Sequence, residues 1–253
     1  AMGAQPIALT VALACPRDTP VTLLEEIARG LTAACASLAP GCGVVGGDLG
    51  RAPVLTAAVT ALGEMQGRTP VLRSGARAGD VVAYAGELGL SGLALGRLFG
   101  LAAEPGPARA RAVAELRERH PAALAAHLAP TPPIHLGIAA AEAGATAMLD
   151  VSDGLSLDAS RLARASAVTL ALDAERLHEA FGQQGGETVP LEAMLTGGED
   201  HGLLATFPPG ATLPGGFHAI GRVVDPVPGT PLLVGGSPFA ARGWDPYAVP
   251  ESP

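Results

Sequence analysis

The sequence has 253 residues, enough for one large domain or two of ordinary size, and its hydrophobic content of 48% allows a sizeable core. The formal net charge of -8 argues against a broad nucleic-acid-binding surface, because phosphate binding needs clustered basic side chains. All 16 basic residues are arginine. The lack of lysine excludes a lysine Schiff base and a P-loop, whose motif requires that residue.

The cysteines and the apolar segments indicate where the protein resides. Cys15, Cys35 and Cys42 are odd in number and lack the spacing of metal ligands, which is typical of free thiols in a reducing compartment. Residues 7–14 are apolar but too few to span a membrane, and no basic segment precedes them as in a signal peptide. We therefore expect a cytoplasmic protein with neither membrane nor nucleic-acid partners.

The first part of the sequence alternates between strand and helix patterns. In chain order we expect a strand at residues 7–14, a helix at 23–38, a short strand that begins at 44–45 and runs into Gly46-Gly47-Asp48, and a strand at 54–62. Thr19 is the expected N-cap of the helix, with Pro20 in its first turn. Glycines and prolines between residues 64 and 80 mark turns, and we place a domain boundary near Gly67. The predicted domains are residues 1–66 and 67–253.

The second part continues the alternation. Strands are expected at residues 81–85, 147–151, 168–172, 203–206, 217–224 and 232–234. Helices are expected at 91–98, 109–128, 138–143, 155–165 and 176–181, and a helix or a turn at 191–195. Pro121 is expected to break the helix at 109–128, because proline lacks the N–H group that a helix interior uses. Interleaved strands and helices predict a mixed α/β fold.

The sequence Asp150-Val151-Ser152-Asp153-Gly154 stands where a predicted strand ends and a predicted helix begins. Two carboxylates flank a hydroxyl there, and a tight turn could present all three to one cation. Such hard oxygen ligands suit Mg²⁺, which completes its coordination with water and substrate phosphates. Taken alone, the pattern more often means that Ser152 or Asp153 is an N-cap and Asp150 a solvated acid.

Two further glycine-acid motifs change that balance. They are Gly46-Gly47-Asp48 and Gly197-Gly198-Glu199-Asp200, and each follows an apolar run. Glycines leave backbone N–H groups free to approach a phosphate, and the acids can hold the metal that neutralises it. A single Gly-Gly-Asp is usually only a turn. Three such motifs, together with the cationic turn at Arg73-Ser74-Gly75-Ala76, favour a site for a magnesium nucleotide.

These motifs resemble those of the thiamine-monophosphate kinase family, within the superfamily of aminoimidazole-ribonucleotide synthetase. The likeness extends along nearly the whole sequence and is carried, in order, by Val45-Gly46-Gly47-Asp48, Leu62-Gly63-Glu64, residues 73–80, residues 147–155, Leu195-Thr196-Gly197-Gly198-Glu199-Asp200, Gly221-Arg222-Val223 and Gly243-Trp244-Asp245. The Gly-Gly-Glu-Asp motif and the late Gly-Trp distinguish the kinases from their synthetase relatives.

The resemblance implies a two-domain α/β architecture and a homodimer whose contact is supplied by the N-terminal domain. ATP and thiamine monophosphate would meet between the domains, and the terminal phosphate of thiamine monophosphate would attack the γ-phosphorus of ATP in line. Mg²⁺ and positioning would offset the repulsion between the two polyanions. The implied product is thiamine diphosphate.

The resemblance also assigns roles to individual residues, and it assigns no covalent or general-base residue. Asp48, Asp150 and Asp153 would hold Mg²⁺. The nucleotide would be contacted by Gly47, Asp48, Arg73 and Ser152. Glu199 and Trp244 would contact the thiamine part, which is physically sensible because a cationic thiazolium favours a carboxylate and an aromatic face.

The sequence also departs from the family pattern. The family's N-terminal Gly-Asp-Asp motif and Thr-Asp metal ligands have no counterpart, so we expect this sequence to begin inside the first domain. Leu49 and Gly50 replace threonines, and His201-Gly202 replaces a common Tyr-Glu. Two alternatives therefore stay open: another ATP-dependent synthetase of the superfamily, and a catalytically inactive nucleotide-binding relative.

Overall fold

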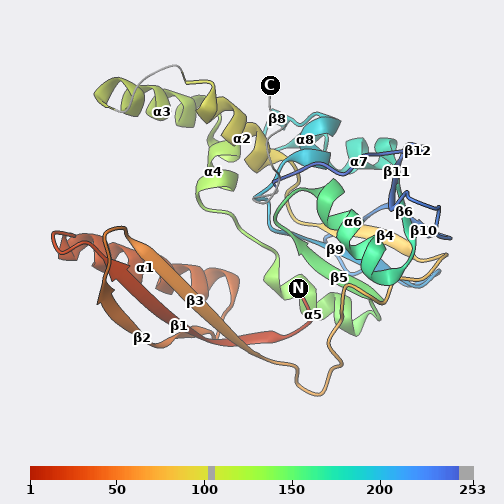
Figure 1. Cartoon of the computed structure of the whole chain (residues 1–253), viewed down its shortest axis with the longest axis horizontal. Helices are drawn as coiled ribbons and strands as arrows, with labels where there is room; N and C mark the ends of the chain where they lie inside the picture. Colours follow the sequence, from red (N-terminus) through yellow and green to blue (C-terminus); the bar gives the residue numbers. More distant parts are fainter. Residues whose placement is uncertain (102–105, 245–253) are drawn as a thin grey trace. The chain divides into compact units, whose positions relative to one another are not determined.

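The computed structural model describes residues 1–101 and 106–244. The chain forms two compact units (Figure 1), and each is described by itself. The small unit comprises Gly3–Pro70, and the large unit comprises Ala1–Met2 together with Val71–Pro253.

The small unit is a three-stranded sheet with one helix. Its elements are β1 (Gln5–Cys15), α1 (Val21–Leu38), β2 (Gly43–Arg51) and β3 (Thr56–Glu64). The strand order is β2-β1-β3, with β1 parallel to β2 and antiparallel to β3. Helix α1 provides the long connection that two parallel strands need. Every residue of β3 is exposed, and α1 buries only Cys35, so this sheet is sparsely covered.

One local prediction in the small unit was wrong, and one strand is longer than expected. Helix α1 begins at Val21 without a side-chain cap, and the Thr19 N–H donates to the Pro16 carbonyl in a turn instead of Thr19 acting as the N-cap. The strand predicted to begin at residues 44–45 is present, and it is longer than the short strand expected. Strand β2 continues to Arg51 because β1 pairs with it over this whole stretch. A Cβ atom at position 47 would collide with the Val11 carbonyl oxygen, so glycine permits this close pairing.

The large unit is built on a seven-stranded sheet with the order β12-β11-β6-β10-β4-β9-β5. Its strands are β4 (Val81–Ala85), β5 (Ala147–Val151), β6 (Thr169–Leu172), β9 (Gly202–Phe207), β10 (Phe217–Val224), β11 (Leu232–Val234) and β12 (Ser237–Pro238). Neighbouring strands are antiparallel except β6 and β11. Strand β5, which carries the central acidic motif at its end, is an edge strand paired with β9.

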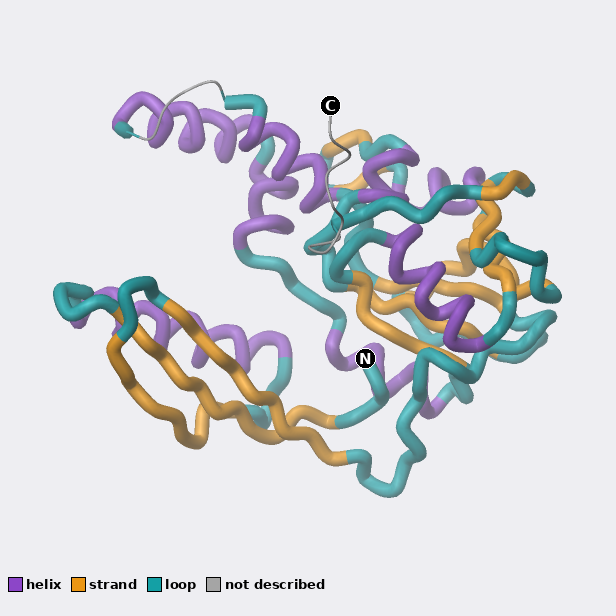
Figure 2. The backbone as a smooth tube through the Cα atoms, in the orientation of Figure 1, coloured by secondary structure: helices purple, strands orange, loops and turns teal. Residues whose placement is uncertain are grey.

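Helices cover both faces of this sheet (Figure 2). They are α2 (Leu90–Phe99), α3 (Pro107–Arg119), α4 (Pro121–Leu128), α5 (Ile134–Glu142), α6 (Leu155–Ser166), α7 (Ala174–Phe181) and α8 (Leu191–Thr196). Alternate residues of β4 enter two separate cores, because side chains of a strand point to opposite faces. One core contains residues of α2, α4, α6, α7 and α8, and the other receives Ala140 of α5.

Most predicted elements of the large unit are present. The helix predicted at 109–128 is interrupted at His120, and Pro121 begins α4, as expected for a residue that cannot donate within a helix. The hairpin formed by β7 (Gln183–Gln184) and β8 (Glu187–Thr188) was not predicted, because each strand has only two residues. No helix in the described part of the chain is both long and apolar enough to cross a membrane.

Candidate functional site

The turn between β5 and α6 carries the central acidic motif. Asp150 is exposed at the end of β5, while Ser152 and Asp153 are half-buried in the turn that follows. Gly154 has a φ of 115°, a conformation that L side chains rarely adopt, and it precedes α6. The turn therefore presents the Asp150 carboxylate to solvent and holds Ser152 and Asp153 close beside the helix.

A buried carboxylate supports this turn from below. Asp158, in the first turn of α6, is only 2% exposed. Its Oδ2 accepts hydrogen bonds from the Ser152 N–H at 3.1 Å and the Asp153 N–H at 3.0 Å. Burial raises the pKa of Asp158, and the hydrogen bonds from Asp153 and Arg161 oppose that rise. Both N–H groups are thus occupied by Asp158 within the protein.

Arg161 adds a positive charge to the same turn. Its Nη1 donates to Asp158 Oδ1 at 2.7 Å and also to Asp153 Oδ2. The other oxygen of Asp153 accepts a long hydrogen bond of 3.4 Å from Ser152 Oγ. Arg161 therefore offsets part of the negative charge of Asp153, whereas the carboxylate of Asp150 has no arginine partner among the described residues.

The oxygen atoms at this turn fit a hard cation such as Mg²⁺. Asp150, Asp153 and Ser152 supply carboxylate and hydroxyl oxygens, the ligand chemistry that Mg²⁺ prefers. Among the described residues no three His, Cys, Asp or Glu side chains form a group that could hold a metal ion. A cation at this turn would thus draw its remaining ligands from water, phosphate oxygens or a further acid.

The Gly197-Gly198-Glu199-Asp200 loop divides its two acids between inside and outside. The Glu199 side chain is 55% exposed, whereas Asp200 is 5% exposed. Asp200 accepts hydrogen bonds from the Gly89 N–H at 2.5 Å and the Ser91 N–H at 3.0 Å, at the start of α2. Burial raises the pKa of Asp200 from 3.8 to about 6, although both hydrogen bonds act in the opposite direction. Asp200 is therefore a capping group for α2, whereas the carboxylate of Glu199 is exposed and lies 3.3 Å from His201 Nε2.

Backbone hydrogen bonds join this loop to the acidic turn. The Glu199 N–H donates to the Ser152 carbonyl at 2.8 Å, and the His201 N–H donates to the Val151 carbonyl at 3.0 Å. Glu199 and His201 have φ values of 69° and 54°, which are uncommon for residues other than glycine. The structure thus brings two of the three predicted motifs side by side.

Trp244 reaches the same place from the end of the described chain. The backbone N–H of Trp244 donates to the Asp153 carbonyl at 2.9 Å, and the side chain of Trp244 is 66% exposed. A side chain at position 243 would collide with the Asp153 carbonyl oxygen, so glycine allows the chain to pass close to the turn. Asp245, the last residue of the predicted motif, lies outside the described residues.

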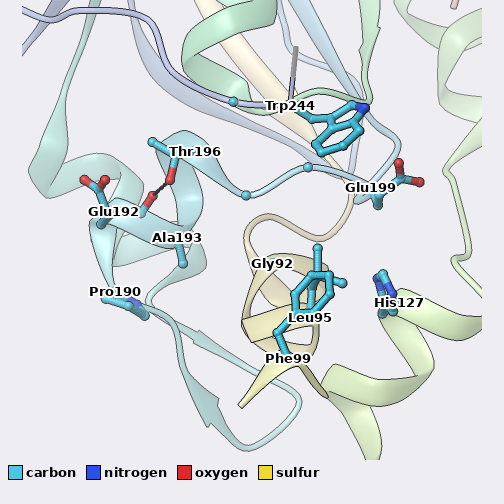
Figure 3. Close-up of a pocket in the computed structure, with 13 residues that line it drawn as sticks. Gly92, Leu95, Phe99, His127, Pro190, Glu192, Ala193, Thr196, Glu199 and Trp244 are labelled. Atoms are coloured by element: carbon cyan, nitrogen blue, oxygen red, sulfur yellow. Dashed lines mark hydrogen bonds between the residues drawn. The ribbon is translucent and has the colours of Figure 1, made fainter. Parts of the chain in front are cut away.

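Glu199 and Trp244 line a pocket of about 720 Å³ (Figure 3). Its walls come from α2, α4, α8 and the loop before β9, and it is lined by Gly92, Leu95, Phe99, His127, Pro190, Glu192, Ala193, Thr196, Gly197, Gly198, Glu199, Gly243 and Trp244. Most of these groups are apolar, with carboxylates from Glu192 and Glu199 and one imidazole. Such a pocket suits a flat, partly cationic organic molecule.

A second cavity of about 440 Å³ lies against Asp150 and His201. His201 Nε2 is 3.3 Å from Glu199 Oε2, so this histidine stands between the acid that lines the large pocket and the cavity beside Asp150.

Arg73 lies beside the edge strand β5. The Met148 N–H donates to the Leu72 carbonyl at 3.1 Å, and Gly75 packs so closely on the Thr146 carbonyl that a Cβ atom would collide with it. Residues 72–75 therefore run antiparallel to β5, whose far end carries Asp150. The side chain of Arg73 is exposed and makes no ion pair within the described part of the chain. It is available to bind an anion.

Gly47 and Asp48 belong to the small unit. Asp48 is exposed on β2, and its Oδ1 accepts a hydrogen bond of 2.9 Å from the Leu49 N–H. Their predicted contacts with metal and nucleotide remain predictions.

Sequence reasoning missed several residues that shape the site. Asp158 and Arg161 were absent from the predicted set, although their spacing of three places both on one face of α6. The acids of the glycine-acid motifs were considered as metal holders in general, and Asp200 is instead buried under α2. His127, which belongs to none of the predicted motifs, lines the large pocket. No sequence signal distinguished it from the other histidines.

Comparisons with known proteins agree with this arrangement. Residues 1–65 match the family described as AIR synthase related protein, N-terminal domain. A thiamine-monophosphate kinase of Mycobacterium tuberculosis is 39% identical over 259 residues, covering 100% of this chain and 71% of the relative. The chain belongs to the thiamine-monophosphate kinase family. A kinase of the same name from Corynebacterium glutamicum is 36% identical, covering 88% of this chain and 65% of the relative.

Solved structures of the thiamine-monophosphate kinase family share the fold. A structure described as AaThiL complexed with AMPPCP and TMP is 30% identical, covers 98% of this chain and 75% of that chain, and has a TM-score of 0.74. The thiamine-monophosphate kinase from Stenotrophomonas maltophilia is 29% identical, covers 94% of this chain and 75% of that chain, and has a TM-score of 0.76. These findings confirm the resemblance and the α/β fold class inferred from the sequence.

Proposed function

We propose that this protein transfers the γ-phosphoryl group of ATP to thiamine monophosphate, forming thiamine diphosphate and ADP. The observation that carries the proposal is the direct link between the acidic turn and the large pocket. The backbone N–H of Glu199 donates to the Ser152 carbonyl, and the backbone N–H of Trp244 donates to the Asp153 carbonyl. A substrate with an organic cation at one end and a phosphate at the other matches two such adjoining regions. The relatives named thiamine-monophosphate kinase support the same activity.

The large pocket would hold the thiamine part of the substrate. The carboxylate of Glu199 would attract the thiazolium cation, and the exposed rings of Trp244 and Phe99 offer aromatic faces to it. Glu192 adds a second carboxylate to the lining. Arg242 pairs with Glu192 at 3.0 Å, so the main uncompensated negative charge is that of Glu199. This charge disfavours the phosphate in the pocket, so the phosphate would extend toward the acidic turn, where Mg²⁺ would neutralise it.

The acidic turn would serve the phosphate groups. Asp48, Asp150 and Asp153 would hold Mg²⁺, which when bound neutralises phosphate charge, while Gly47, Asp48, Arg73 and Ser152 would contact the nucleotide. The exposed guanidinium of Arg73 would pair with phosphate oxygens. Asp158 and Arg161 would keep Ser152 and Asp153 in place through the hydrogen bonds already described.

The transfer itself would be direct. An oxygen of the substrate phosphate forms a bond to the γ-phosphorus of ATP as the bond from that phosphorus to the β–γ bridging oxygen breaks, and ADP leaves. The attacking phosphate is already ionised near neutral pH, so no general base is needed. The protein would act by positioning the reactants and by electrostatic stabilisation, without a covalent intermediate.

The small unit would supply a homodimer contact. Its strands β2 and β3 expose large apolar side chains, namely Val44, Val45, Leu49, Val59 and Leu62. Clustered exposed apolar groups are typical of surfaces that another protein covers. We place residues 1–66 in the N-terminal domain and residues 67–253 in the C-terminal domain of a cytoplasmic enzyme.

The test is a direct assay of the full 253-residue chain. We expect thiamine diphosphate and ADP to appear in equal amounts when thiamine monophosphate, ATP and Mg²⁺ are present, measured by chromatography. Omitting thiamine monophosphate is the control for unproductive ATP hydrolysis. Binding of thiamine monophosphate without product would favour a catalytically inactive relative. Failure to bind it at all would contradict the proposal.

A further inference from the structure

His127 lies on the wall of the large pocket, on helix α4 (Figure 3). In this view its ring lies beside Leu95 and Phe99, with Glu199 above it. His127 Nδ1 is 2.9 Å from the hydroxyl oxygen of Ser91, near the start of α2. This hydrogen bond connects two of the helices that form the pocket.

The surroundings of Ser91 determine the direction of that hydrogen bond. Ser91 is completely buried, and its N–H donates to Asp200 Oδ1 at 3.0 Å. Among the described residues, His127 Nδ1 is the one hydrogen-bond partner of the Ser91 hydroxyl. A buried hydroxyl that leaves its proton unbonded loses free energy, so Ser91 Oγ–H should donate to Nδ1. The neutral imidazole then carries its proton on Nε2.

His127 Nε2 is available to a ligand. It has no hydrogen-bond partner within the described part of the chain, and the ring lines the pocket instead of being enclosed in the core. With Nδ1 occupied, the ring presents a single N–H donor. Ser91 fixes which nitrogen carries the proton, and Asp200 fixes Ser91 by binding the N-terminal N–H groups of α2.

The charges of the lining indicate which part of the substrate meets this donor. Glu192 and Glu199 contribute carboxylates to the pocket, and no arginine is among the described residues that line it. Glu192 is paired with Arg242 at 3.0 Å, so Glu199 is the less compensated of the two carboxylates. A phosphate is therefore disfavoured near His127, whereas the neutral aminopyrimidine ring of thiamine monophosphate has nitrogen acceptors and suits an apolar pocket. We propose that His127 Nε2–H donates a hydrogen bond to a ring nitrogen of this aminopyrimidine and thereby selects the substrate, with Ser91 as a positioning residue. The inference rests on the proposed function.

The single tryptophan of the chain gives a direct binding assay. Trp244 lines the same pocket, so its fluorescence should report thiamine monophosphate binding without any need for turnover. His127→Leu should weaken binding about tenfold, the size expected for one hydrogen bond lost from a desolvated site. His127→Gln, whose amide N–H can replace Nε2–H, should stay within about threefold of the parent protein. His135→Leu, at an exposed position on α5, is the matched control and should bind as the parent does.

Substrate analogues make the assignment specific. Replacing each aminopyrimidine ring nitrogen in turn by a C–H group should identify one analogue that binds the parent about tenfold more weakly. The His127→Leu variant should bind that analogue and thiamine monophosphate equally. Ser91→Ala should raise KM for thiamine monophosphate several-fold while leaving KM for ATP unchanged, because it acts through the orientation of His127. Thermal unfolding of each variant shows whether the fold is retained.

The outcomes separate this inference from the proposed function. If the parent protein does not bind thiamine monophosphate, the proposed function fails and this inference with it. If the parent binds and His127→Leu binds equally well, only the role of His127 is overturned. If folded His127→Leu and His127→Gln lose the same amount of affinity for thiamine monophosphate, the role of His127 is also overturned. Such a result would mean that a hydrogen-bond donor at this position does not contribute to binding.

Discussion

Three motifs that look alike in the sequence have two different kinds of support in the structure. In the large unit, the turn at residues 150–154 and the loop at residues 197–200 each use a buried aspartate, Asp158 or Asp200, to accept backbone N–H groups. In the small unit, Gly46-Gly47-Asp48 lies within strand β2, where ladder hydrogen bonds to β1 satisfy the backbone. The Asp48 side chain is exposed, and among the described residues its carboxylate bonds only to the N–H of Leu49.

This difference between the two units links the orientation of an exposed acid to the stability of the fold around it. A buried carboxylate is costly unless hydrogen bonds compensate it, so Asp158 and Asp200 hold their segments in one arrangement. The exposed acids Asp150 and Glu199 lie on these segments, so their backbone positions are fixed by the same hydrogen bonds. Asp48 is ordered by the sheet alone, and its side chain should be replaceable without loss of fold.

The largest effect is expected at Asp150. Asp150→Asn should lower the rate of phosphoryl transfer by about a thousandfold, because removing a metal ligand forfeits several kcal/mol of charge stabilisation in the transition state. Its melting temperature should be unchanged, since the side chain is exposed. Turnover of thiamine monophosphate and thermal unfolding measure the two quantities. Asp225→Asn, another exposed site, is the control, and normal turnover by Asp150→Asn would remove the metal assignment.

Asp158 should give the largest effect on folding. Asp158→Ala leaves the N–H groups of Ser152 and Asp153 without their acceptor and removes one of the two carboxylates that bind Arg161, which should lower the free energy of unfolding by about 3 kcal/mol. Asp48→Ala should change it by less than about 0.5 kcal/mol, as at other surface sites. Urea denaturation measures both. Similar losses in the two variants would invalidate the contrast between the units.

Asp200 should make stability depend on pH. Its pKa is raised from 3.8 in the unfolded chain to about 6 in the folded protein, so the folded state retains a proton that the unfolded state releases. The stability contributed by Asp200 is therefore full below about pH 4 and is lost as the pH rises through about 6, a change of up to about 3 kcal/mol.

Asp200→Asn cannot ionise and should remove this dependence. The free energy of unfolding of the parent, relative to that of the variant, should fall between pH 4.5 and pH 7, as measured by urea denaturation at both values. A difference that rises with pH instead would show that ionised Asp200 is favoured, and that its bonds to Gly89 and Ser91 outweigh burial.

The smallest effect is expected at the rim of the pocket. Trp244→Ala should raise KM for thiamine monophosphate about tenfold, in line with the loss of one cation–π contact, and should change KM for ATP much less. Steady-state kinetics with each substrate varied in turn measures the difference. Val227→Ala, an exposed apolar site on another loop, is the control. An equal change in both KM values would contradict the assignment of Trp244 to the thiamine part.

The sequence alone determined the family, the α/β class and most elements. Apolar periodicity located strands such as β5 and helices such as α6, because burial imposes a spacing that the sequence displays directly. Pro121 marked the break between α3 and α4 for an equally local reason. The motif order identified Asp150, Asp153, Glu199 and Trp244 as candidates.

Only the tertiary structure determined which contacts hold and orient those candidate residues. Asp200 points inward and Glu199 outward because α2, more than a hundred residues earlier, offers N–H groups that only a buried acceptor can satisfy. Gly46-Gly47-Asp48 lies within a strand because β1 pairs with it along its whole length. His127 is held in the wall of the pocket by the hydrogen bond between its Nδ1 and the hydroxyl of Ser91. Such contacts join residues far apart in the chain, and local patterns carry no signal of them.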